Sequence, residues 1–178
     1  MSTCGKRLGS SVVGLLVVVV FSGLARAAEE DRGKAELVLG GEKISVDYGR
    51  PSTEGKGYHS LEKGIAEGTL WRMGKNEATR LESEADLKFG DAVVKAGKYR
   101  LAAKKTKDGW DLLVHPKAEG WGTPVPKDGY VATIPLKLGE IEEEAKLLTI
   151  ALAEKEGTAT FTLSWGKQTL SAEFKLAE

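Results

Sequence analysis

The 178-residue chain has one cysteine, two histidines and equal numbers of basic and acidic residues, 26 of each. The cysteine, Cys4, lies close to the N-terminus, so we expect the folded domain to contain no disulfide and no thiol nucleophile. His59 and His115 are far apart in sequence, whereas metal sites need clustered His, Cys or carboxylate ligands. A chain without a basic surplus also lacks the signature of a nucleic-acid binder. We therefore expect no metal, no cofactor and no nucleic-acid partner.

The N-terminus has the pattern of a secretory signal peptide. Lys6 and Arg7 precede an apolar run at residues 12–24, and Ala-Arg-Ala at residues 25–27 fits a small-x-small cleavage site. The run is shorter than the roughly 20 apolar residues that a spanning helix needs. We expect cleavage after Ala27, export to the periplasm or the extracellular space, and no retained membrane span; a retained anchor is the alternative. Cleavage leaves 178 − 27 = 151 residues with a net charge of 23 − 26 = −3.

Apolar and polar residues alternate through most of the remaining chain, which is the period of half-buried β-strands. Glycine-containing turns separate the segments, the acidic run at residues 140–144 is interpreted as a solvated turn, and no helical period competes. The sequence predicts one all-β domain at residues 36–178, an antiparallel β-sandwich of two packed sheets, after a disordered leader at residues 28–35. Extended segments are predicted at residues 37–39, 43–48, 70–73, 78–82, 86–89, 92–94, 98–104, 110–114, 130–138, 148–152, 161–165 and 170–176.

The segment at residues 71–79, Trp-Arg-Met-Gly-Lys-Asn-Glu-Ala-Thr, sets directional polar groups beside an aromatic side chain and contains the only asparagine of the chain. Together with Val-Asp-Tyr-Gly-Arg-Pro at residues 46–51 and Ala-Gly-Lys-Tyr at residues 96–99, it resembles bacterial domain-of-unknown-function family 2911. Glu-Gly-Trp-Gly at residues 119–122 and Leu-Ser-Trp at residues 163–165 follow in the order of that family. The resemblance implies an exported bacterial protein with a compact β domain and no established activity.

Polar and aromatic side chains of these motifs are our candidates for a ligand site. The guanidinium groups of Arg50 and Arg72 suit a carboxylate or a phosphate, and an indole ring can stack on a sugar or a base. We therefore predict a polar pocket at the rim of the sandwich for a small polar or anionic ligand. The ligand-binding candidates are Asp47, Tyr48, Arg50, Trp71, Arg72, Asn76, Glu77 and Trp121.

The same residues admit a structural interpretation. An acidic neighbour can pair with Arg50 or Arg72 and so fix two strand ends by charge-assisted hydrogen bonds. Asn76 can adopt a left-handed turn conformation, and Trp71 can belong to the core. In either interpretation we expect a carboxylate to hold Arg72, because a partly buried guanidinium must be paired.

Catalysis has less support in the sequence. No Gly-x-Ser-x-Gly elbow is present, and the adjacent His59 and Ser60 point apart if their segment is extended. We assign no catalytic residue and favour a non-catalytic structural or small-ligand-binding domain. Two alternatives stay open: a protein-interaction module that contacts another exported protein of the cell envelope, and a hydrolase with a histidine assembled in space.

Overall fold

The computed structural model describes residues 1, 31–54, 61 and 64–178, and this part of the chain is built from β-strands, with no helix among its elements. The all-β prediction is confirmed. The signal peptide predicted for residues 1–27 and the histidine at position 59 lie outside the described residues, apart from Met1. The strands are β1 (Arg32–Leu39), β2 (Glu42–Gly49), β3 (Leu70–Trp71), β4 (Thr79–Ser83), β5 (Leu87–Phe89), β6 (Ala92–Val94), β7 (Gly97–Lys105), β8 (Trp110–His115), β9 (Ala132–Lys155) and β10 (Thr158–Leu176).

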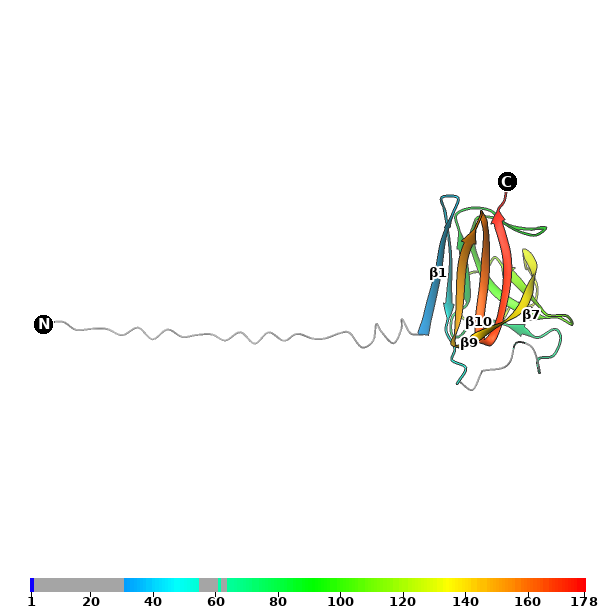
Figure 1. Ribbon diagram of the computed structural model, residues 1–178, viewed down its shortest axis with the longest axis horizontal. Helices are drawn as coiled ribbons and strands as arrows, with labels where there is room; N and C mark the ends of the chain where they lie inside the picture. Colours follow the sequence, from blue (N-terminus) through cyan, green and yellow to red (C-terminus); the bar gives the residue numbers. More distant parts are fainter. Residues whose placement is uncertain (2–30, 55–60, 62–63) are drawn as a thin grey trace.

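The strands form one antiparallel hydrogen-bonded path in the order β1-β2-β4-β7-β8-β9-β10-β5-β6, with β3 beside β7. The long strand β9 pairs with β8 through residues 132–136 and with β10 through most of its remainder. It thereby carries the path from one layer to the other, and β9 and β10 cross in front of the remaining strands in Figure 1. The antiparallel arrangement agrees with the prediction, but the strands form one continuous hydrogen-bonded sheet in place of the two separate sheets expected.

Two boundaries differ from the sequence prediction. The acidic run at residues 140–144 lies inside β9, where Glu140 faces Gln168 and Ala145 faces Gly166. Because more residues of β9 than of β10 separate these two pairs, β9 bulges out between them, and Gly166 adopts a left-handed φ of 65° without reversing the chain. The segments predicted as strands at residues 161–165 and 170–176 are therefore one strand, β10.

The first strand also begins earlier than predicted. Arg32 opens β1, inside the segment expected to be a disordered leader at residues 28–35. Its charged residues do not prevent strand formation, because Lys34 and Glu36 are exposed and form an ion pair of 2.7 Å with each other. An antiparallel sheet tolerates such charges wherever one of its faces meets solvent.

Aromatic side chains join the two layers in the core. The ring of Trp71 stacks on Trp165 of β10, with centroids 5.6 Å apart and planes 12° apart, and lies 5.7 Å from the ring of Trp110. The hydroxyl of Tyr48, on β2, donates to the carbonyl oxygen of Ile150 on β9 over 3.1 Å. These contacts fix the first layer against β9 and β10.

The turn between β3 and β4 is tightly folded against the end of β2. Met73 and Asn76 both have left-handed backbone conformations, with φ of 55° and 61°, and the hydroxyl of Thr79 donates to the Met73 carbonyl over 2.9 Å. Left-handed residues other than glycine are uncommon, and a tightly packed surrounding structure must hold them. The left-handed turn predicted at Asn76 is confirmed. A Cβ atom on Gly49 would lie 2.1 Å from the Lys75 carbonyl oxygen, so only glycine fits there.

We predict that Gly49→Ala lowers the free energy of unfolding by about 3 kcal/mol, because its methyl group would collide with backbone that cannot swing away. Gly109→Ala is the matched control, since a Cβ there would meet nothing closer than the Leu136 carbonyl oxygen at 3.8 Å. The control should change stability by less than about 0.5 kcal/mol. Urea denaturation of both variants and the wild type tests this, and equal midpoints for the two variants would contradict it.

Candidate functional site

A row of polar side chains crosses the outer face of five neighbouring strands, from β1 to β8. Because successive side chains of a strand point to opposite faces, each residue of the row alternates with core residues on its own strand. Each member is also the cross-strand partner of the next. We call this set the charged row; its members in order are Lys34, Asp47, Arg80, Arg100 and His115.

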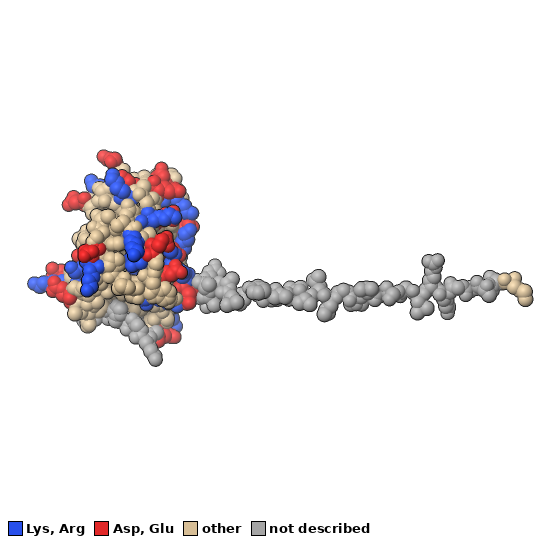
Figure 2. Space-filling model, turned by 180° about the vertical axis from the view of Figure 1, so that it is seen from behind, with Lys and Arg blue, Asp and Glu red and all other residues tan. Residues whose placement is uncertain are grey.

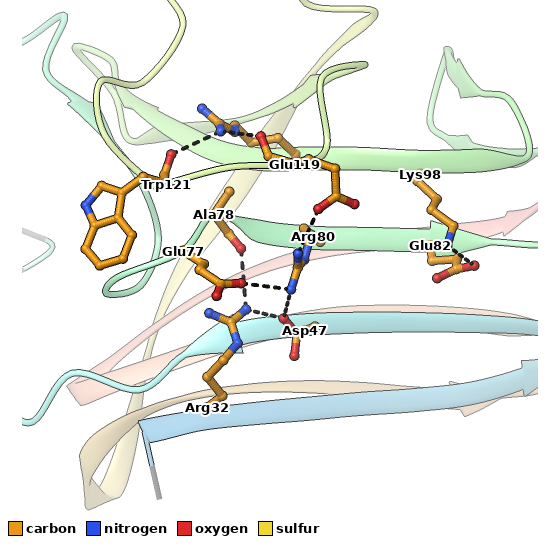
Figure 3. A network of polar contacts seen from close by, with 10 residues as sticks. Arg32, Asp47, Glu77, Ala78, Arg80, Glu82, Lys98, Glu119 and Trp121 are labelled. Atoms are coloured by element: carbon orange, nitrogen blue, oxygen red, sulfur yellow. Dashed lines mark hydrogen bonds and ion pairs between the residues drawn. The ribbon is translucent and has the colours of Figure 1, made fainter. Parts of the chain in front are cut away.

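Arg80 is the centre of a network of carboxylates (Figure 3). Its Nη2 atom donates to Oδ1 of Asp47 over 3.0 Å and to Oε2 of Glu77 over 3.2 Å. Its Nη1 atom donates to Oε2 of Glu119 over 3.1 Å. Asp47 also accepts a hydrogen bond from Nη2 of Arg32. Charge-assisted bonds of this kind fix the positions of the groups that make them, so the carboxylates are oriented as well as neutralised.

The environment of Asp47 favours its ionised form. Desolvation acts to raise the pKa of Asp47, but the hydrogen bonds and positive charges of Arg32 and Arg80 together outweigh it, and the pKa lies below its ordinary value. A carboxyl group that acts as a general acid needs a raised pKa. Asp47 is therefore suited to accept hydrogen bonds rather than to give up a proton.

Arg100 is the most enclosed charge of the row, with 6% of its surface exposed. Its Nη2 atom donates to the carbonyl oxygens of Glu119, over 3.0 Å, and of Trp121, over 3.1 Å. Its Nε atom has no hydrogen-bond partner within the described part of the chain. Arg80 and Arg100 are direct cross-strand partners, yet the former binds carboxylate side chains and the latter neutral carbonyl groups.

The turn before β4 holds the loop that covers Arg100. The amide of Gly122 donates to the Asn76 carbonyl over 2.8 Å, the amide of Ala78 donates to the Gly120 carbonyl over 3.1 Å, and Glu77 forms an antiparallel bridge with Trp121. The indole of Trp121 nevertheless remains 57% exposed. The motif at residues 71–79 thus positions an exposed aromatic side chain through its backbone.

Two of the predicted site residues belong to the core. Tyr48 is 4% exposed, and its hydroxyl is bound to the Ile150 carbonyl as described above. Trp71 is packed between Trp110 and Trp165. Neither ring faces the charged row, so for Trp71 the structural interpretation fits its position.

The two predicted arginines are also placed away from the row. The side chain of Arg72 donates from Nε to the Gly74 carbonyl over 3.0 Å, and none of the described residues supplies the expected carboxylate partner. The backbone amide of Arg50 donates to the Asp31 carbonyl over 2.9 Å, and its buried Nε has no partner in the same part of the chain.

Of the remaining candidates, Asp47 and Glu77 both bind Arg80. Asn76 accepts a hydrogen bond from the amide of Gly122, the residue that follows Trp121. Sequence reasoning missed Arg32, Arg80, Arg100 and Glu119 as parts of this arrangement. The signal that could have found Arg80 and Arg100 is their place at outward positions of predicted strands.

A groove of about 400 Å³ lies along the row, beside the Arg80 network. We call it the outer groove; it is lined by Lys34, Ser45, Asp47, Arg80, Leu81, Glu82, Lys98, Ala118 and Glu119. Positive and negative side chains are intermingled on the side of the molecule that Figure 2 shows, and neither sign forms a continuous field there. The lining of the groove likewise offers positively charged hydrogen-bond donors and negatively charged acceptors.

His115, at the end of the row, is held by structural contacts. Its Nδ1 atom accepts a hydrogen bond from the amide of Lys117 over 3.1 Å, and its ring lies edge-on to Tyr130 with centroids 5.7 Å apart. Across the described residues, no group of three or more His, Cys, Asp or Glu side chains is arranged to hold a metal ion. The same residues contain no helix with the length and apolar character of a membrane span.

We predict that Asp47→Asn makes the free energy of unfolding less dependent on pH below about pH 4. The folded-state pKa of Asp47 lies below its ordinary value of 3.8, so the wild type has the full stabilisation above that value and loses it as pH falls through the folded pKa. Urea unfolding at pH values from about 5 to about 2 measures the slope. Asp91→Asn, in the exposed turn between β5 and β6, is the control; a wild-type slope in Asp47→Asn would contradict the prediction.

Comparison with known proteins gives one match. The model of the family described as "Protein of unknown function (DUF2911)" matches residues 30–174, which span β1 to β9 and nearly all of β10. No curated protein and no solved structure matches the chain. The resemblance read from the motifs is confirmed: the chain belongs to the DUF2911 family.

Proposed function

We propose that the protein is an exported, non-catalytic domain that binds a small polar ligand in the outer groove. The observation that carries the proposal is the fixed arrangement of Asp47, Arg80 and Glu119 along one groove of about 400 Å³. Small-molecule sites typically occupy about 300–1,000 Å³ and use a few firmly placed polar groups. Export is supported by the signal-like N-terminus of the sequence.

The lining of the groove favours a ligand with hydroxyl groups or with charges of both signs. Lys34 and Lys98 supply cations, while Glu82 and Glu119 supply carboxylates, 56% and 76% exposed, that can accept further hydrogen bonds. A ligand of one charge would meet repulsion from half of the charged residues of this lining. Sugars, polyols and zwitterions are the compounds whose donors and acceptors match it.

A non-catalytic role follows from the state of these groups. Asp47 has a lowered pKa and two guanidinium partners, which is the opposite of what a general acid at neutral pH requires. His115 holds a backbone amide and an aromatic ring. A bound ligand can accept from or donate to these groups while their present contacts persist. Proton transfer by Asp47 or His115 would first have to break the ion pairs of Asp47 or the hydrogen bond of His115.

A protein-interaction module is the second candidate, and one observation favours it. β1 is the terminal strand of the order, and it carries Val38 with 66% of its surface exposed. A terminal strand with an exposed apolar side chain can accept a strand from another protein. The outer groove remains the stronger candidate, because its polar groups are already fixed in place.

We predict that a screen of sugars, polyols and zwitterionic compounds identifies at least one that raises the melting temperature of the protein. A ligand at about 100 times its Kd adds about 2.7 kcal/mol to the free energy of unfolding, which corresponds to several degrees for a domain of this size. Lys98→Ala should weaken binding of that compound at least about tenfold, a loss of about 1.4 kcal/mol. Lys98 lines the groove, and its exposed ion pair with Glu82 contributes little stability.

Lys95→Ala is the matched control, because Lys95 is an exposed lysine of the same region, paired with Asp86 over 2.7 Å outside the groove. It should bind the compound as the wild type does. Melting temperatures unaffected by every compound, or equal affinities of Lys98→Ala and the wild type, would contradict the proposed function.

A further inference from the structure

A second cavity, of about 420 Å³, shares the lining residue Glu119 with the outer groove. It opens between the loop that connects β8 to β9 and the strands β7 and β8, and we call it the Trp121 crevice. Unlike the groove, it has mostly apolar walls, supplied by the loop. Its lining residues are Arg100, His115, Lys117, Glu119, Gly120, Trp121, Thr123, Pro124, Val125 and Pro126.

The guanidinium of Arg100 is the polar group that this crevice leaves incompletely paired. Arg100 is 94% buried, and two of the five N–H donors of a guanidinium are used by the carbonyl groups of Glu119 and Trp121. Its buried Nε has no partner, and no carboxylate pairs with the side chain, within the described residues. A buried positive charge without a negative partner is costly, so an anion that reached it would be bound favourably.

The neighbours of Arg100 strengthen this preference. Its cross-strand partners are Arg80 on one side and His115 on the other, and neither is negative. The carboxylate of Glu119, which lines both cavities, is bound to Arg80 instead of Arg100. Among the described residues, the hydrogen-bond partners of Arg100 are therefore neutral carbonyl groups of the loop.

The aromatic wall of the crevice is rigidly placed. Trp121 is 57% exposed, but its backbone is fixed by the bridge to Glu77 and by the hydrogen bond from Arg100 to its carbonyl oxygen. Pro124 and Pro126 line the same cavity and have few conformations of their own. A flat apolar group can stack on such a surface without first ordering it.

We propose that the Trp121 crevice binds a small organic carboxylate, with the carboxylate on the guanidinium of Arg100 and a flat apolar body against the indole of Trp121. The planar fork of a guanidinium matches a carboxylate in geometry and charge. The walls are too apolar for a strongly hydrated multivalent anion. Arg100 and Trp121, the two residues that would bind this ligand, do not line the outer groove, so the proposal does not depend on the proposed function.

Benzoate and its neutral amide, benzamide, are matched probes for this site. The indole N–H signal of Trp121, one of four tryptophans, can be assigned in a ¹⁵N-correlated NMR spectrum by its absence in Trp121→Phe. Titration with benzoate should shift this signal saturably below about 20 mM, and benzamide should bind at least about tenfold more weakly. The indole signals of the buried Trp110 and Trp165 report whether each variant keeps its fold.

Variants separate the two halves of the site. Arg100→Lys keeps the charge but loses the planar fork, so the preference for benzoate over benzamide should fall to about threefold or less. Trp121→Ala, followed through the amide signals of Gly120 and Gly122, should weaken both probes about tenfold, since stacking contributes to both. Lys117→Ala is the control for the exposed cation of the lining and should leave the preference within about twofold.

Three outcomes would overturn the proposal. The first is the absence of a saturable shift of the Trp121 signal with benzoate, and the second is equal affinity for benzoate and benzamide in the wild type. The third is a preference that disappears in Lys117→Ala or at about 0.5 M salt, because screening weakens exposed charge pairs far more than a buried one. A preference that survives salt and is lost in Arg100→Lys supports it.

Discussion

The close approach of two backbones, at Gly49 and Lys75, is the constraint on which the outer face depends. Gly49 follows Asp47 by two residues on β2, and Lys75 lies in the turn that precedes β4. Because the turn is pressed against the end of β2, β4 begins at a fixed position, and Arg80 comes to lie opposite Asp47. The left-handed residues of the turn are unfavourable alone and persist because this packing leaves the chain no other path.

Arg80 and Arg100 lie directly opposite each other on neighbouring strands, and two like charges in this position destabilise a sheet unless other groups compensate them. Glu119 binds both side chains: its carboxylate accepts from Arg80, and its carbonyl oxygen accepts from Arg100. The loop between β8 and β9 is therefore part of the electrostatics of the sheet. The same residue lines both the outer groove and the Trp121 crevice, two cavities of unlike character.

The alternation of polar and apolar residues predicted the strands well, because a half-buried strand can be recognised from its two-residue period alone. It could not predict that β9 and β10 continue through residues 140–144 and Gly166, since a bulge and a turn both use extra polar residues and a left-handed glycine. Nor could it predict the Arg80 network. The partners of Arg80 come from β2, from the turn and from a loop 39 residues away, and their meeting depends on the register between strands.

The motif at residues 71–79 is the most specific pattern in the sequence, yet none of its side chains lines either cavity. Its backbone exchanges hydrogen bonds with residues 120–122 and so holds that loop, while its glycine, Gly74, packs against Gly49. Within the described residues the motif serves as a scaffold for this loop. The groups that we propose for recognition are Arg80 and Arg100 on the strands and Glu119 and Trp121 on the loop. The motif therefore explains how this surface is built, whereas the proposed recognition rests on the groups that the surface presents.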